Sequence, residues 1–104
     1  MEITTQELKD KIKNGEKIMV DFWASFCGPC KIMKPMFEKA SKTLNEQNSK
    51  VQLYTFDISQ DREFVVDLGI TSVPTIKGFS NGNETFSEIG LKQTNMIIEL
   101  ANKL

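Results

Sequence analysis

No histidine occurs among the 104 residues of this chain, and only two cysteines do. Without histidine, the chain lacks the commonest general base at neutral pH and the commonest zinc ligand. Because a zinc site takes about four ligands, two cysteines alone do not support one within a single chain. We therefore expect no metal and no bound cofactor.

The sequence also has no hydrophobic run near the roughly 18 residues that a membrane span requires. The polar residues 1–5 contain no signal-peptide core, so we expect a cytoplasmic protein, in a compartment where a structural disulfide would not persist. The 13 basic and 14 acidic residues give a net charge of −1. That balance argues against nucleic acid or an anionic membrane surface as a partner.

What the sequence does contain predicts one α/β domain over residues 1–104. Hydrophobic periodicity and turn residues predict helices over about 5–13, 28–45, 64–68 and 96–104, and strands over 18–23, 51–58, 75–79 and 85–89. Helices between strands imply parallel pairing with right-handed crossovers, and the hairpin at Asn81-Gly82 adds an antiparallel edge. We predict three layers, α/β/α, around a mixed sheet of four strands, with room for a very short strand before the first helix.

Cys27 and Cys30 lie three residues apart, where a strand is predicted to lead into a helix. That spacing puts helical β-carbons about 5–6 Å apart, close to the roughly 3.5–4.5 Å of a disulfide. One backbone can therefore hold both the dithiol and the disulfide, as a redox carrier requires. The helix N-terminus favours a thiolate at Cys27, which predicts that Cys27 attacks and Cys30 resolves. The alternative is a pair of small buried hydrophobic residues, which suits cysteines at a Gly-Pro turn less well.

Two other features each allow two interpretations. Asp21 lies between Val20 and Phe22 in an apolar strand. It is either a buried carboxylate of raised pKa that exchanges a proton with Cys30, or a polar residue at a strand end that faces water. Pro74 either starts a strand or forms a cis turn beside the cysteines, with the preceding backbone free to pair with a peptide.

The segment from Val20 to Lys31 (VDFWASFCGPCK), together with Pro35, the Val73-Pro74-Thr75 triplet and Gly90, resembles the thioredoxin family over essentially the whole chain. The resemblance implies the thioredoxin fold and the activity of a protein-disulfide reductase. It also implies a monomer that binds disulfide-containing target proteins. An external reductase, the NADPH- and flavin-dependent thioredoxin reductase, would recharge its redox-active disulfide.

Roles for individual residues follow from the resemblance. Cys27 would be the nucleophile, Cys30 the resolving thiol and its disulfide partner, and Asp21 a buried acid/base. The resemblance further implies that Pro74 is cis. A substrate-binding surface would contain Trp23, Phe26, Gly28, Pro29, Val73, Pro74 and Gly90.

The chain departs from the family pattern near both cysteines. Phe26 replaces a usual tryptophan, which removes an indole N–H from the docking surface. Thr55 stands where many members have a lysine, so the pKa of Asp21 should rise further. Two other functions stay open: a thioredoxin-fold binding module or accessory subunit, and a dedicated electron donor to one reductase.

Overall fold

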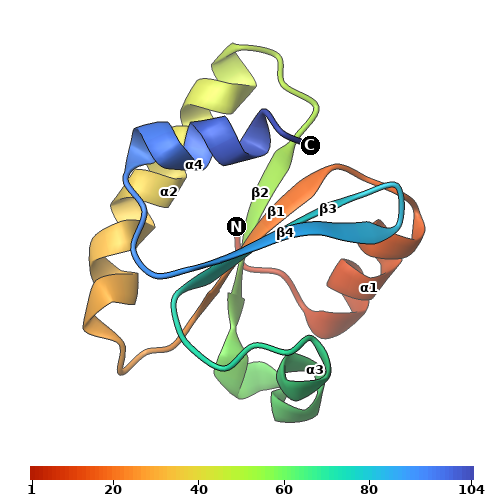
Figure 1. Ribbon diagram of the computed structural model, residues 1–104, viewed down its shortest axis with the longest axis vertical. Helices are drawn as coiled ribbons and strands as arrows, with labels where there is room; N and C mark the ends of the chain where they lie inside the picture. Colours follow the sequence, from red (N-terminus) through yellow and green to blue (C-terminus); the bar gives the residue numbers. More distant parts are fainter.

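The computed structural model describes residues 1–104 as a four-stranded sheet with helices on both faces (Figure 1). Its elements confirm the predicted α/β class and mixed sheet. None of the helices is long and apolar enough to cross a membrane. In chain order the elements are α1 (Thr5–Lys13), β1 (Ile18–Trp23), α2 (Gly28–Glu46), β2 (Gln52–Asp57), the 3-10 turn η1 (Ile58–Gln60), α3 (Arg62–Asp67), β3 (Thr75–Ser80), β4 (Asn83–Ile89) and α4 (Thr94–Ala101).

The strands lie in the order β2-β1-β3-β4. β1 is parallel to β2, as predicted, but β3 is antiparallel to β1. The expectation that every intervening helix implies parallel pairing was therefore wrong for α3. The six residues of α3 span only about 9 Å, whereas a six-residue strand spans about 20 Å. The chain does not return along the sheet, so β3 begins where β1 ends, with Thr75 paired to Phe22.

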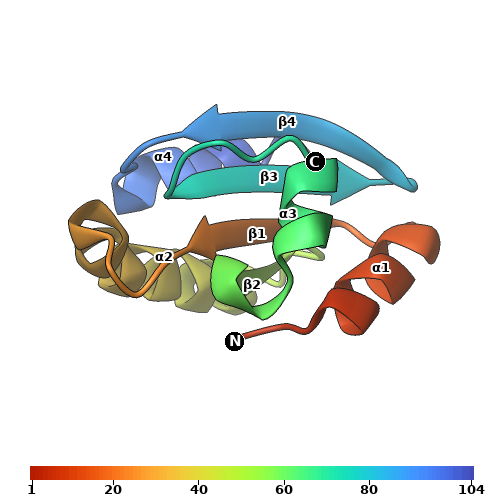
Figure 2. The same ribbon diagram turned by 90° about the horizontal axis from the view of Figure 1, so that it is seen from below.

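Two hydrophobic clusters hold the layers together. On one face of the sheet α2 and α4 pack over one cluster, and on the other face α1 and α3 pack over the second (Figures 1 and 2). β1 contributes to both clusters and is buried from Ile18 to Phe22. This central strand carries Asp21 into the interior and ends where α2 begins. The clusters consist of Met19, Met33, Phe37, Ala40, Leu44, Val51, Leu53, Ile76, Ile97, Leu100 and Ala101 on the first face, and Ile3, Leu8, Ile18, Val20, Phe22, Phe56, Phe64, Val65, Ile70 and Phe79 on the second.

The short strand that the sequence allowed before α1 is a single parallel bridge between Glu2 and Thr55. Ile3 then leads into α1, whose start is fixed by a capping box. The Thr4 side chain accepts from the Glu7 backbone N–H, and the Glu7 carboxylate accepts from the Thr4 N–H. The first residues therefore lie along the outer edge of β2, close to where β1 ends.

Candidate active site

The two cysteines lie at the first turn of α2 and form a disulfide, with their α-carbons 5.3 Å apart. Cys27 is the N-cap residue, and the backbone N–H of Cys30 donates to its sulfur at 3.2 Å. Pro29 follows within the first turn, where its missing N–H costs no helical hydrogen bond. The backbone therefore meets the geometric demand of a dithiol–disulfide pair and places one sulfur among the unpaired N–H groups of a helix start.

The surroundings of the two sulfurs differ. Cys27 is 7% exposed and follows Phe26, whose side chain is 82% exposed. Gly28 and Pro29 are exposed as well. Cys30 is 3% exposed and lines a partly open pocket between α2 and the strands β1 and β2. Cys27 thus borders the exposed apolar surface around Phe26, and Cys30 borders this pocket on the other side.

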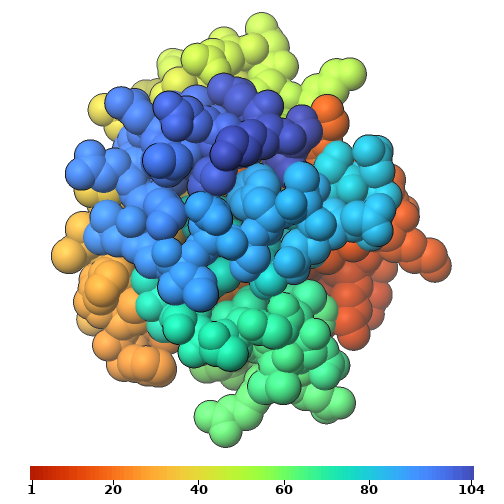
Figure 3. Space-filling view, viewed as in Figure 1, coloured from red at the N-terminus to blue at the C-terminus, as the bar shows by residue number.

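The Val73–Pro74 peptide bond is cis, and the loop that carries it lies against the cysteines. Val73 packs on the small cluster of Ala24, Cys27 and Cys30, and its backbone N–H and C=O make no hydrogen bond within the protein. The Pro74 ring is fully buried, and its carbonyl accepts from the Gly90 N–H at 2.9 Å. In Figure 3 the start of α2 (orange) and the loop before β3 (green to cyan) meet at the surface.

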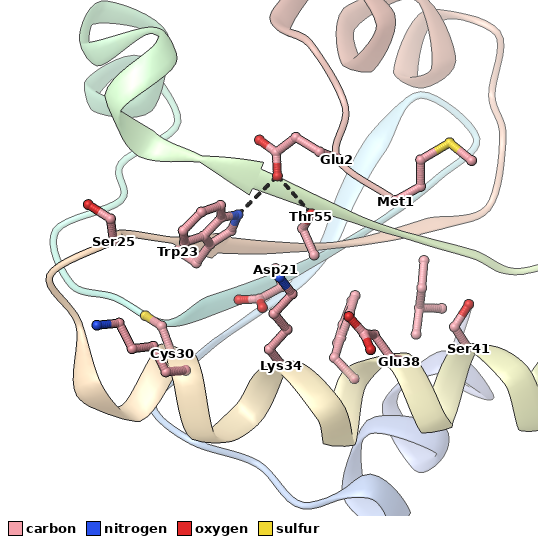
Figure 4. Close-up of a pocket in the computed structure, with 13 residues that line it drawn as sticks. Met1, Glu2, Asp21, Trp23, Ser25, Cys30, Lys34, Glu38, Ser41 and Thr55 are labelled. Carbon is pink, nitrogen blue, oxygen red and sulfur yellow. Dashed lines mark hydrogen bonds between the residues drawn. The ribbon is translucent and has the colours of Figure 1, made fainter.

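Asp21 is only 2% exposed, and its Oδ1 has no hydrogen-bond partner. The interpretation in which this carboxylate faces water is therefore wrong. Burial, and to a lesser extent the negative charge of Glu2, raises the pKa of Asp21 to about 7. Asp21 and Cys30 line the same cavity of about 670 Å³ (Figure 4). A buried carboxyl group with a pKa near neutral therefore lines the same pocket as Cys30.

The family model described as Thioredoxin matches residues 1–103. The chain belongs to the thioredoxin family. It is 35% identical over 102 residues to the thioredoxin of Rickettsia prowazekii, covering 97% of this chain and 94% of that protein. It is 34% identical over 97 residues to the thioredoxin of Mycoplasma genitalium, covering 93% of this chain and 91% of that protein.

The fold agrees with that assignment. A solved structure of Plasmodium falciparum thioredoxin superposes with a TM-score of 0.85 at 30% identity, covering 99% of this chain and 98% of that one. Family membership and a Cys-X-X-Cys pair at disulfide distance identify the protein as a thiol–disulfide oxidoreductase, of the protein-disulfide reductase type. No group of three or more histidine, cysteine, aspartate or glutamate side chains is placed to hold a metal ion.

One residue at this pocket, Glu2, was not predicted from the sequence. Glu2 lines the cavity beside Asp21, and its carboxylate accepts hydrogen bonds from the Trp23 indole and the Thr55 hydroxyl (Figure 4). A lone acidic residue ahead of a helix carries no local signal, because its partners lie 21 and 53 residues away. The Thr55 hydroxyl therefore holds a carboxylate at the edge of the Asp21 pocket.

Proposed function

We propose that the protein reduces disulfides of other proteins, with Cys27 as the nucleophile and Cys30 as the resolving thiol. The Cys27 thiolate bonds to one sulfur of the target disulfide, whose S–S bond breaks and whose second sulfur leaves as a thiolate and takes up a proton. Cys30, after losing its proton, attacks the Cys27 sulfur. The mixed disulfide breaks, the Cys27–Cys30 disulfide forms, and the target leaves with two more electrons as a dithiol.

One observation carries this assignment, namely the position of Cys27 as the N-cap of α2 with its sulfur accepting the Cys30 N–H. Unpaired N–H groups and the helix dipole stabilise negative charge at that sulfur. The thiolate is the attacking species in the first step, so these groups favour that step. When Cys30 closes the disulfide, the leaving group is the sulfur of the target, not Cys27.

Asp21 completes the second step in this proposal. Its carboxylate takes the proton of the Cys30 thiol as that sulfur attacks, and returns it when the disulfide is reduced again. The shared cavity supports this role, because Asp21 and Cys30 both line it and solvent can carry a proton between them. A base with a pKa near 7 also suits proton transfer at neutral pH.

We place the docking of target proteins on the surface around Cys27. Phe26, Gly28 and Pro29 would provide apolar contact, and the unpaired Val73 backbone would hydrogen-bond an extended segment of the target. Trp23 and Gly90 would border the same surface. Because the Pro74 ring is buried, its part would be to hold the loop in place rather than to touch the target.

Recycling needs an external partner. We propose that a thioredoxin reductase, drawing on NADPH through a flavin, reduces the Cys27–Cys30 disulfide after each cycle. The protein would act as a monomer in the cytoplasm, where the reducing poise keeps the dithiol available. The Gly-Pro pair between the cysteines resembles that of reducing members of the family.

The assignment is tested by a reduction assay and a redox titration. The wild-type protein should accelerate the reduction of insulin disulfides by dithiothreitol, and a variant with Cys27→Ser and Cys30→Ser should not. Equilibration with glutathione should give a potential well below the roughly −120 mV of strongly oxidising periplasmic enzymes. A potential near that value would contradict the assignment of the protein as a reductant. If the double variant kept its activity in cells, the protein would instead be interpreted as a thioredoxin-fold binding module.

The exposed Phe26 ring gives a separate expectation for docking. Phe26→Ala should raise the KM for insulin about tenfold, because an apolar contact worth about 1.5–3 kcal/mol is largely lost. A small aromatic disulfide reaches Cys27 without that contact, so its reduction rate should change less than about twofold. Phe26→Leu should restore most of the insulin activity. Steady-state kinetics with both substrates measures this, and an equal loss with both would contradict a docking role.

A further inference from the structure

The Glu2 carboxylate collects hydrogen bonds from segments that are far apart in the chain. Oε1 accepts from the Trp23 indole N–H at 3.0 Å and from the Thr55 hydroxyl at 2.7 Å. Oε2 accepts from the Asp57 backbone N–H at 2.6 Å and from the Gln60 side-chain amide at 3.2 Å. The Glu2 carboxylate thus accepts four hydrogen bonds although the residue is exposed, and these bonds hold the side chain in one position.

The backbone on either side fixes that place. The Ile3 N–H donates to the Thr55 carbonyl at 2.9 Å, and the Thr55 N–H donates to the Met1 carbonyl at 3.0 Å. The Gln60 amide also donates to the Ile3 carbonyl at 2.9 Å. The segment therefore lies along the edge of β2 as a short strand would, with the Glu2 carboxylate turned toward the active-site end of the sheet.

This carboxylate forms part of the wall of the Asp21 cavity. In the parallel register of β1 and β2, Thr55 is the residue paired with Asp21, and Thr55 donates to Glu2 (Figure 4). The other charged or titratable groups that line the cavity are Lys31, Lys34 and Glu38 of α2, the Cys30 thiol in the reduced state, and the α-amino group that Met1 carries in this chain. From β3, Lys77 is paired with Val20 and so lies on the opposite face of the sheet.

Among these groups only Glu2 is fixed by hydrogen bonds beside the acid. It follows burial as the second cause of the raised Asp21 pKa. Lys31, Lys34 and Glu38 are exposed and make no hydrogen bond to another side chain. Their charges are free to move into solvent, where water and salt screen them.

We propose that Glu2 is a positioning residue for disulfide exchange: its carboxylate holds the Trp23 indole against the edge of β2 and keeps a fixed negative charge beside the buried Asp21. This inference rests on the proposed role of Asp21 and extends it. The charge favours the protonated acid, so Asp21 gives up its proton at higher pH than burial alone would set. The hydrogen bond from the Trp23 indole to Glu2, here called the indole clamp, keeps the Trp23 ring in place in the pocket wall beside Cys30.

Two substitutions separate the charge from the clamp. Glu2→Gln removes the charge and keeps one acceptor oxygen, whereas Glu2→Ala removes all four hydrogen bonds. Glu38→Gln is the matched control, because it removes one negative charge from the same cavity without breaking a hydrogen bond. The midpoint of the Asp21 carboxyl titration is read from its ¹³C resonance in the oxidised protein, with Asp21→Asn to assign the signal.

In Glu2→Gln the midpoint should move to lower pH, and in Glu38→Gln it should stay at the wild-type value. The chain has a single tryptophan, so one indole N–H signal reports on the clamp. In Glu2→Ala that proton should exchange with solvent about fivefold faster, as expected for the loss of one hydrogen bond. Circular dichroism shows whether each variant is folded. If Glu2→Ala does not fold, Glu2→Gln alone still tests the effect of the charge.

An unchanged midpoint in Glu2→Gln, or an equal shift in Glu38→Gln, would overturn the role of Glu2. Both measurements are made on the oxidised protein at rest, so they do not depend on turnover. The role of Asp21 is tested separately, by the pH dependence of insulin reduction in Asp21→Asn. If that profile matched the wild type, the acid/base assignment would fail even where Glu2 still shifted the titration.

Discussion

Cys30→Ser should stop turnover and leave the target covalently bound to Cys27, whereas Cys27→Ser should stop turnover without trapping anything. In the first variant the thiolate at the N-cap of α2 still attacks, but no second sulfur remains to break the mixed disulfide. In the second variant the remaining Cys30 thiol is only 3% exposed and lies away from the surface around Phe26, so we expect it not to reach the target. Each rate of insulin reduction should fall roughly a thousandfold or more.

Mass spectrometry without reducing agent measures the complex, and dithiothreitol serves as the control because it must release the target from Cys27. Comparable complexes on both variants would mean that either sulfur can attack first, which contradicts the division of roles. A stable complex that survives dithiothreitol would be non-covalent and would favour the binding module. The targets trapped on Cys30→Ser in a cell extract would also show whether the protein serves many disulfides or one reductase.

The sequence was most informative where a few adjacent residues determine the geometry. The Asn81-Gly82 pair predicted the hairpin because both residues adopt positive φ readily, and their φ angles are 56° and 85°. The Cys27–Cys30 spacing gave the disulfide geometry before the sheet was known. Each of these features depends on local backbone preferences alone.

Features that depend on distant segments were predicted less well. The direction of β3 follows from how little of the sheet α3 can span. The helix predicted over about 64–68 is already that short, but the alternation of helices and strands predicts parallel pairing without regard to its length. The burial of Asp21 depends on α2 covering that face of β1. Sequence reasoning left it open until the family resemblance favoured it. Glu2 had no signal at all, because its role exists only once β2 lies beside it.

The Thr55 substitution shows where resemblance helps and where it ends. Comparison with the family indicated the absence of a nearby lysine, and hence a higher pKa for Asp21. It did not indicate that the Thr55 hydroxyl would hold a carboxylate in that region. The lack of a cation that the resemblance implied and the negative charge of Glu2 both raise the pKa of Asp21. The raised pKa of Asp21 therefore depends in part on Glu2, a residue that the family resemblance did not single out.

Asp21→Asn should make the oxidised protein more stable, and increasingly so as the pH rises. The pKa of Asp21 is about 7 in the folded protein, against 3.8 for the free side chain. Between those values the folded state holds a proton that the unfolded state has released, so the free energy of unfolding falls as pH rises. Below about pH 4 both states are protonated and the effect vanishes, and above about pH 7 it levels off.

The expected size follows from that difference in pKa. A pKa difference of about three corresponds to roughly 4 kcal/mol in the free energy of unfolding. This is an upper value, because the folded protein relaxes around a buried charge. Asparagine has nearly the same shape and does not titrate, so Asp21→Asn removes this penalty. Urea unfolding at pH 4.5, 6 and 8 measures it. The difference from wild type should be small at pH 4.5 and largest at pH 8.

Asp67→Asn is the matched control, because it makes the same chemical change at an exposed residue of α3 that forms no hydrogen bond. Its stability should stay within about 0.5 kcal/mol of wild type at every pH. If Asp21→Asn ran parallel to wild type across the range, the raised pKa would be wrong. If Asp21→Asn were less stable than wild type at pH 8, the ionised Asp21 carboxylate would be stabilised in the folded protein by a partner such as a bound water molecule.

A gain in stability from Asp21→Asn would also sharpen the functional argument. An ionised carboxylate with an unpaired oxygen, buried in the central strand, opposes folding at the pH where the protein works. Packing alone would favour an apolar residue there, so its presence needs a chemical reason. The proton transfer to and from Cys30 supplies one. The same variant that is more stable at pH 8 should therefore release reduced insulin more slowly, because the mixed disulfide on Cys27 resolves without its base.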